Sequence, residues 1–381
     1  MDSGRYFFLG VFCVLYSLYT RISIIGNSWW SSHDPRYYFL FASSFFFVFS
    51  FHFFLPPTPL IWVSRSLTSS TSKVSPLTVG FYATSCPSAE SLIQRATQAK
   101  FNVDKTITAG LLRIFFHDCF VQGCDASNLI KSTATNKAEL DAVPNLTLHG
   151  MDLIDTAKAA VEEACPGVVS CADIIALATR DAVVIAGGET YAVPTGRRDS
   201  RVSLASSVNL PGPGFSVASA AAAFRGRGLD ITDMVTLLGA HTVGGAHCEF
   251  FYNRLYNFNG TDGLQDPSMA ESLAASLKAA CPMKSVTSRY PVGKTTVAID
   301  QGTEFVFDTS YYHQLQHNHG VLQIDQELTH DPTTSPIVKS LAKGSATHFS
   351  SSFGNAIVKM GNIGVLTGSQ GEIRRICSKI N

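Results

Sequence analysis

An arginine and a histidine stand four residues apart in the stretch LLRIFFHDCFVQGCDAS, at Arg113 and His117. On a helix this spacing places two side chains one turn apart on the same face. A histidine can take a proton from a bound molecule, and a permanent cation beside it can stabilise the negative charge that develops. The apolar neighbours Ile114, Phe115 and Phe116 favour an interior cleft, and the alternative is a solvated face with an incidental histidine.

Oxygen-bearing side chains follow the histidine directly, at Asp118, Asp125 and Ser127. Two cysteines five residues apart enclose a turn at Gly123 between them. Two carboxylates and a hydroxyl around a tight, disulfide-closed turn suit a Ca²⁺ cage that would hold the end of the helix. An acidic turn on the surface is the alternative.

A second histidine-centred stretch, LLGAHTVGGAHC, places His241 at the end of an apolar helix. A histidine in this position is commonly a packed core residue. It becomes a candidate metal ligand where a carboxylate accepts a hydrogen bond from its other ring nitrogen. Asp308 and Asp325 are both candidates for that carboxylate, and periodicity does not choose between them.

A third histidine group consists of His313, His317 and His319. The first two have the HxxxH spacing of zinc proteases, but Gln314 occupies the position where those enzymes need a glutamate. A polar helix end accounts for this group.

The elements that must position these residues are predicted to be helices. Apolar residues recur at intervals of three and four over residues 88–102, 106–121, 150–164, 172–186, 216–227, 231–241, 267–280, 307–318 and 336–342. Ser170 and Asp230 are the expected caps of two of these helices. Strand-like runs are few and short, as at residues 296–300. The pattern predicts an all-α single domain in two packed halves.

Charge and cysteine content exclude some classes of protein. Lys+Arg and Asp+Glu are equal at 29 each, so no basic surplus points to nucleic acid. Of the nine cysteines, Cys13 lies in the N-terminal leader, and eight remain in the rest of the chain. An even number behind a targeting segment, with no CxxC doublet, predicts four disulfides rather than a zinc site, and their pairing stays open at this stage.

The first 76 residues differ from the rest in being rich in aromatic residues and serine. Residues 6–19 have the length of a signal-peptide core, and residues 37–63 are long enough to span a membrane but are interrupted by His52 and by Pro56 and Pro57. We expect a hydrophobic leader over 1–76 that is removed, and a domain over 77–381. A membrane anchor and a mis-assigned gene start are the alternatives.

Many motifs together resemble one family. They are FYATSCP, RIFFHDCFVQGCDAS, CPGVVSCADIIAL, PTGRRDS, LLGAHTVGGAHC, RLYNF, FDTSYY, DQEL and MGNIGVLTGSQGEIRRIC. Their order and spacing resemble the secreted plant haem peroxidases, class III, over residues 77–381. The resemblance implies a haem peroxidase fold, with a distal and a proximal helical half sandwiching one haem b. It also implies an enzyme that reduces H₂O₂ and oxidises small phenolic donors one electron at a time, in lignification, wall cross-linking or the oxidative stress response.

The resemblance implies roles for residues on the distal side of the haem. Arg113 and His117 correspond to the pair that cleaves peroxide, and Phe116 packs between them and the haem edge. Asn145 corresponds to the residue that hydrogen-bonds the distal histidine and keeps it basic, with Glu139 behind it.

On the proximal side, His241 corresponds to the axial iron ligand. Asp325 corresponds to the carboxylate that accepts a hydrogen bond from this ligand and pushes electron density towards the iron. Pro194 matches the position whose backbone contacts aromatic donors.

Two calcium ions and the cysteine pairing are also implied by the resemblance. The distal calcium residues would be Asp118, Val121, Gly123, Asp125 and Ser127, with Glu139 close by, and the proximal ones Thr242, Asp300, Thr303, Val306 and Asp308. The implied disulfides join Cys86 with Cys165, Cys119 with Cys124, Cys171 with Cys377, and Cys248 with Cys281.

The sequence departs from the family pattern at Asn128, where an apolar residue is usual, and at His149, where an arginine is usual. Asn259 begins a glycosylation sequon in a loop. We expect a secreted monomer in the apoplast or cell wall, with the vacuole as an alternative, and no stable membrane association once the leader is removed.

Two rival functions make different demands on the sequence. A non-catalytic, disulfide-stapled wall or membrane-tethered binding protein would show damage at Arg113, His117, Asn145 or His241, and none is visible. A hydrolase would need a nucleophile motif such as GxSxG, which is absent.

Overall fold

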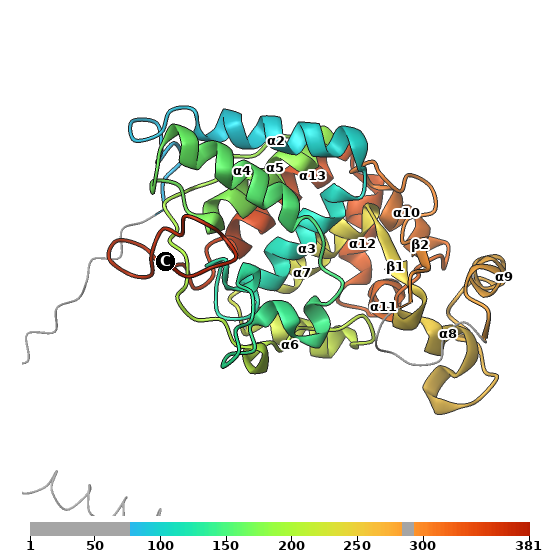
Figure 1. Cartoon of the computed structure of the whole chain (residues 1–381). Coiled ribbons are helices and arrows are strands. Elements are labelled where there is room, and N and C mark those ends of the chain that lie inside the picture. Colours follow the sequence, from blue (N-terminus) through green and yellow to red (C-terminus); the bar gives the residue numbers. More distant parts are fainter. Residues whose placement is uncertain (1–76, 284–292) are drawn as a thin grey trace, which may run out of the picture. The chain divides into compact units, whose positions relative to one another are not determined.

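Four α-helices of the described residues begin at a side chain that accepts a backbone N–H of the first turn: Ser170, Ser216, Asp230 and Ser345. The computed structural model describes residues 77–283 and 293–381 (Figure 1). The Ser170 hydroxyl accepts from the backbone N–H of Asp173, and Asp230 and Asp233 form a reciprocal capping box. Both predicted caps are therefore confirmed.

Helices dominate the described residues. The α-helices are α2 (Ala89–Val103), α3 (Ile107–Cys119), α4 (Met151–Ala164), α5 (Cys171–Ile185), α6 (Val217–Arg225), α7 (Ile231–Leu238), α8 (Tyr252–Tyr256), α9 (Glu271–Ala280), α10 (Ser310–Gln316), α11 (Gln323–His330), α12 (Ser335–Lys343) and α13 (Ala346–Met360). The 3₁₀ turns that matter below are η2 (Ser127–Leu129), η3 (Glu139–Asp141), η4 (Val143–Asn145) and η6 (Gly239–Thr242). Two short strands, β1 (Gly245–His247) and β2 (Thr296–Ala298), pair antiparallel, with Ala246 opposite Val297. The prediction of a mostly helical haem peroxidase fold is confirmed.

Two groups of helices position the candidate site residues Arg113, His117 and His241. Helices α2, α4 and α5 pack against one another, and α3 packs against α5 (Figure 1). On the other side of the site, α7 packs against α13 and runs directly into η6, which also packs against α10 and α3. One buried apolar cluster runs through both groups, from Ile93 on α2 to Ile357 on α13.

Several element boundaries differ from the sequence prediction. Helix α7 ends at Leu238, so His241 lies on the 3₁₀ turn η6 rather than on the α-helix expected over residues 231–241. Helices α9 and α10 start later than expected, at Glu271 and Ser310. Helices α8, α11 and α13 were not predicted, because short or serine-rich sequences weaken the apolar periodicity there.

Four disulfides join the eight cysteines of the described residues. They are Cys86 with Cys165, Cys119 with Cys124, Cys171 with Cys377, and Cys248 with Cys281. These are the pairs that the resemblance implies. The bond between Cys171 and Cys377 closes a separation of 206 residues and ties the C-terminal segment to the start of α5.

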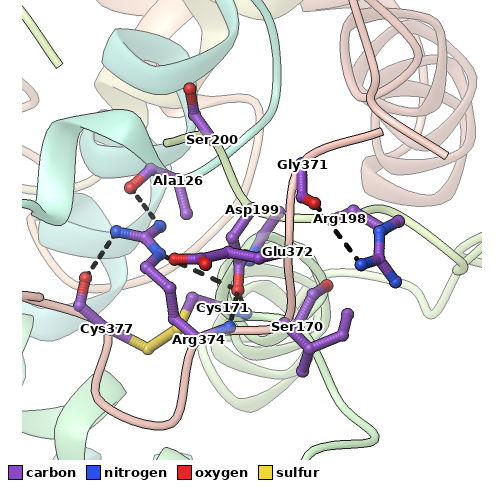
Figure 2. A network of polar contacts seen from close by, with 12 residues as sticks. Ala126, Ser170, Cys171, Arg198, Asp199, Ser200, Gly371, Glu372, Arg374 and Cys377 are labelled. Atoms are coloured by element: carbon purple, nitrogen blue, oxygen red, sulfur yellow. Dashed lines mark hydrogen bonds and ion pairs between the residues drawn. A yellow bond between two sulfur atoms is a disulfide. The ribbon is translucent and has the colours of Figure 1, made fainter. Parts of the chain in front are cut away.

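A buried polar network strengthens this connection (Figure 2). The Asp199 carboxylate accepts from the backbone N–H groups of Cys171, Ala172 and Arg374, at 2.9–3.1 Å. The fully buried Arg374 guanidinium donates to the carbonyls of Ala126 and Cys377, each at 2.6 Å. The C-terminal segment is thereby fixed to the loop that follows α3.

The predictions for the leader, residues 1–76, lie outside the described residues. Within the described ranges, no helix is both long and apolar enough to cross a membrane.

Candidate active site

His117 is buried on the last turn of α3, and its hydrogen bonds define which ring nitrogen is free. Its Nδ1 lies 2.6 Å from Asn145 Oδ1, and Asn145 Nδ2 donates to the carbonyl of Glu139 at 2.7 Å. A carbonyl can only accept, so the Asn145 amide must turn its oxygen towards the histidine. Nδ1 of His117 therefore carries the proton, and Nε2 keeps its lone pair.

The surroundings of His117 hold it in the neutral form. Burial, and then the nearby Arg113 charge, lower the pKa of His117 to about 3, although the hydrogen bond to Asn145 acts in the opposite direction. A neutral imidazole with a free Nε2 is a proton acceptor at physiological pH.

Arg113 lies one turn before His117 and is held by the same loop. Its guanidinium donates to the Pro144 carbonyl at 2.9 Å, and to the carbonyl and hydroxyl of Thr147 at 2.9 and 2.8 Å. Asn145, the partner of His117, lies between these two anchors. One short stretch at η4 therefore positions both members of the pair that the spacing in the sequence singled out.

Phe116 belongs to a small aromatic cluster beside this pair. Its ring centroid is 5.4 Å from that of His117, 4.5 Å from that of Phe120, and 6.4 Å from that of Phe224 on α6. Pro194 is the residue whose backbone was expected to contact the aromatic substrate. Its carbonyl accepts a hydrogen bond from the Arg197 guanidinium at 2.8 Å.

His241 has the carboxylate partner that a metal-ligating imidazole needs. Its Nδ1 lies 2.8 Å from Oδ1 of the fully buried Asp325, so Nδ1–H donates and Nε2 is left with a free lone pair. Of the two candidate carboxylates, the structure brings Asp325 to the ring, whereas Asp308 lies against Thr242. The His241 side chain is 30% exposed, whereas its partner Asp325 is fully buried.

The two histidine-bearing elements lie close together. Gly244, three residues after His241, has φ +87°, and a Cβ there would come within 2.4 Å of the Ala109 methyl on α3.

Opposing effects act on the pKa of His241. Burial lowers this pKa and the Asp325 carboxylate raises it, and the net change is an increase. The Arg113 charge opposes protonation of this ring too. Arg113 therefore acts electrostatically on both histidines.

Three buried carboxylates gather beneath His117. Asp118 Oδ2 accepts from the Ala126 N–H at 3.0 Å, Asp125 Oδ1 from the Ser127 N–H at 3.0 Å, and Glu139 Oε2 from the Ser127 hydroxyl at 3.2 Å. Oδ1 of Asp118 and Oε1 of Glu139 are buried without a hydrogen-bond partner. Burial, and then the Asp125 charge, raise the pKa of Asp118, and raise that of Glu139 to about 7. Buried acceptors in excess of donors are what a bound cation would satisfy.

The two backbone ligands expected in this loop are already engaged within the chain. The Val121 carbonyl accepts from Arg227 at 2.6 Å, and the Gly123 carbonyl accepts from the Asp125 N–H at 2.9 Å. Each carbonyl oxygen has a second lone pair, so these bonds leave room for a cation.

The five residues expected around the proximal calcium also converge. The Thr242 hydroxyl lies 3.1 Å from Asp300 Oδ2, 3.5 Å from the Val306 carbonyl and 3.3 Å from Asp308 Oδ1. The Thr303 hydroxyl lies 3.3 and 3.1 Å from the same two carboxylates. This all-oxygen set has the donor chemistry of a Ca²⁺ site and adjoins His241 directly.

Within the described ranges, no three His, Cys, Asp or Glu side chains form a metal site by themselves. The oxygen clusters above would therefore need their hydroxyl and carbonyl ligands.

In the third histidine group, His317 Nδ1 bonds the His313 carbonyl and His319 Nδ1 bonds Gln314. These contacts are those of a polar helix end.

Both departures from the family pattern have local partners. The buried Asn128 amide donates to the Ile114 carbonyl on α3 at 2.9 Å. The exposed His149 contacts the hydroxyl and carbonyl of Thr106, each at 3.3 Å. Neither touches His117 or His241 through a hydrogen bond given by the structure.

Comparison with known proteins agrees with this geometry. The chain matches the peroxidase family model over residues 93–344. It is 47% identical to peroxidase 71 of Arabidopsis thaliana over 323 residues, which cover 84% of this chain and 95% of the relative. It is 48% identical to peroxidase 57 of the same plant, over 80% of this chain and 93% of the relative. Peroxidase 5 of Vitis vinifera is 46% identical, over 84% and 97% of the two chains.

The chain therefore belongs to the peroxidase family. Within it, the chain is a member of the class III plant peroxidases, haem enzymes that act on H₂O₂. The four disulfides are consistent with passage through the secretory pathway.

Sequence reasoning missed three residues around the two histidines. Pro144 and Thr147 anchor Arg113 mainly through backbone carbonyls, which leave no signal in side-chain type. Tyr311 donates its hydroxyl to Asp325 at 2.9 Å, and the YY pair of the FDTSYY motif was the available signal.

Proposed function

We propose that this chain cleaves H₂O₂ between His117 and Arg113 and uses the oxidising equivalents to take single electrons from two small phenolic molecules in turn. The observation that carries the proposal is the matched pair of histidines, each with Nδ1 committed to a partner and Nε2 free. Haem b, when bound, would supply the redox chemistry that peroxide reduction and one-electron oxidation of a donor require.

His117 would act as base and then as acid. Its Nε2 takes the proton from the peroxide oxygen nearer the cofactor and returns it to the farther oxygen, which leaves as water. Arg113 stabilises the negative charge that develops as the O–O bond breaks. Asn145 holds Nδ1–H, so the tautomer with a basic Nε2 is maintained.

His241 would hold the iron through Nε2. The Asp325 carboxylate accepts its Nδ1–H, which increases the electron density that the ring donates and favours oxidised iron. One electron from each of two donor molecules, together with two protons, completes the reduction of one H₂O₂ to two waters. Phe116 would line the haem edge, and the Pro194 backbone would contact the aromatic donor.

Two Ca²⁺ ions would stabilise this arrangement. The distal one would be held by Asp118, Val121, Gly123, Asp125 and Ser127 beside Glu139, and the proximal one by Thr242, Asp300, Thr303, Val306 and Asp308. Both clusters adjoin a histidine of the site in sequence, at His117 and His241, so each ion would fix the backbone beside one of them.

We further propose that residues 1–76 are removed and that residues 77–381 act as a secreted monomer in the apoplast or cell wall. The support is the even number of cysteines, all in disulfides, in the described domain. Lignification, wall cross-linking and the response to oxidative stress are the proposed settings.

The test measures the absorption spectrum and the guaiacol oxidation of the protein purified in the presence of haem. It should show a Soret band and oxidise guaiacol only when H₂O₂ is present. A protein without a Soret band, or one that holds haem and fails to turn over guaiacol with peroxide, would overturn the proposal.

A further inference from the structure

Asp325 receives two hydrogen bonds on the same oxygen. Its Oδ1 accepts from His241 Nδ1–H at 2.8 Å and from the Tyr311 hydroxyl at 2.9 Å. Its other oxygen, Oδ2, is buried and has no hydrogen-bond partner among the described residues. Tyr311 is itself buried on α10, and its ring lies edge-on to that of His241 with centroids 6.0 Å apart.

From this arrangement we infer that Tyr311 is a positioning residue that moderates the proximal histidine through Asp325. The phenol must be the donor, because a carboxylate only accepts. Two donors on one oxygen compete for its electron density, so the hydrogen bond from Tyr311 weakens the pull of Asp325 on the His241 proton.

The consequence for His241 has a definite sign. With the phenol present, the His241 ring keeps more of its proton and donates less electron density to a bound iron. Without the phenol, Oδ1 would be a stronger acceptor, the ring would become more imidazolate-like, and the oxidised iron would gain stability. The inference rests on the proposed roles of His241 as ligand and Asp325 as its partner.

The neighbouring tyrosine provides a matched control. Tyr312 is also buried on α10, but its hydroxyl donates to the carbonyls of Val235 and Thr236, at 3.1 and 3.4 Å, and not to Asp325. Tyr312→Phe thus removes a buried hydroxyl from the same helix and leaves both donors to Asp325 in place.

The experiment measures the Fe(III)/Fe(II) reduction potential and the iron–histidine stretching frequency of the haem-loaded full chain. Tyr311→Phe should lower the potential and raise the stretching frequency, whereas Tyr312→Phe should leave both unchanged. Site-specific 3-fluorotyrosine at position 311, a stronger donor that keeps the ring, should shift both quantities the other way. This second variant keeps the inference testable if Tyr311→Phe fails to bind haem.

Asp325→Asn separates the inference from the proposed function. It should raise the potential, and Tyr311→Phe should then cause no further shift in the double variant, because its effect passes through Asp325. A shift with Asp325→Asn but none, or an upward one, with Tyr311→Phe overturns the role of Tyr311 alone. No shift with Asp325→Asn overturns the proposed roles of His241 and Asp325 as well.

Discussion

His117 combines burial, a cationic neighbour and one fixed hydrogen bond, and this combination decides its protonation. The pKa of His117 is held at about 3, so the ring stays neutral far below the usual histidine range. A base works only when unprotonated, and a lowered pKa therefore extends its working range towards acid.

We expect the rate constant for reaction with H₂O₂ to stay flat from about pH 8 to about pH 5 and to fall only at more acid pH. Stopped-flow measurement at the Soret band over this range checks the prediction. A decline centred near pH 6.5, the ordinary histidine pKa, would contradict it.

The same shift affects stability. Below about pH 6.5 the unfolded chain takes up a proton on this histidine while the folded chain does not. The contribution of neutral His117 to the free energy of unfolding is therefore complete above that pH. This contribution is lost as the pH falls towards 3.

Only part of the residue-scale site could be predicted from local sequence. Arg113 and His117 are one turn apart, so their spacing alone suggested a joint function. Asn145 lies 28 residues from His117 and Asp325 lies 84 residues from His241, and these partners followed from the family resemblance rather than from periodicity. Periodicity did not choose between Asp308 and Asp325; the resemblance pointed to Asp325, and the structure places Asp325 against His241.

At the scale of elements, Arg374 holds the C-terminal segment to the loop that follows α3. Arg374→Leu removes a buried guanidinium and leaves the Ala126 and Cys377 carbonyls and the buried Asp199 charge without that partner. We expect the free energy of unfolding to fall by about 3–5 kcal/mol. Denaturant titration measures this change.

The adjacent Arg375 is exposed and serves as the control, since Arg375→Leu should change the stability by less than about 0.5 kcal/mol. Equal losses for the two variants would show that the network at Arg374 is not what stabilises this segment.

The two oxygen clusters give a second prediction at this scale. Metal analysis of the purified protein should find two Ca²⁺ per chain. Chelation should lower the melting temperature, because ions bound only to the folded state stabilise it, and added Ca²⁺ should restore it. Protein that contains no calcium and melts at the same temperature with and without a chelator would contradict this account.

Elements were predictable where apolar periodicity is strong. The bounds of α2, α4 and α5 agree with the prediction to within about two residues, which is the usual uncertainty of helix ends. Helix α11 carries Asp325 yet has only two buried apolar residues, Ile324 and Leu328, so its sequence gives no stripe. Helix α13 has serines and Gly354 among its apolar positions, and tertiary packing rather than pattern makes it a helix.

At the scale of the whole molecule, the leader can be followed by fluorescence. All three tryptophans, Trp29, Trp30 and Trp62, lie within residues 1–76. Protein isolated from the plant cell wall should therefore show tyrosine but no tryptophan emission, and its N-terminal sequence should begin near residues 70–78. Tryptophan emission from a membrane fraction would instead support retention of the leader as an anchor.

The central claim is that His117 is the base that transfers the peroxide proton. The most direct test is stopped-flow reaction of the haem-loaded His117→Leu variant with H₂O₂, with His149→Leu as a control that removes an exposed histidine of the same half. We predict a rate constant about 10²–10⁴-fold lower for His117→Leu, with the Soret band retained, and an unchanged rate for His149→Leu. Haem-loaded His117→Leu that reacts with peroxide at the wild-type rate would contradict the account.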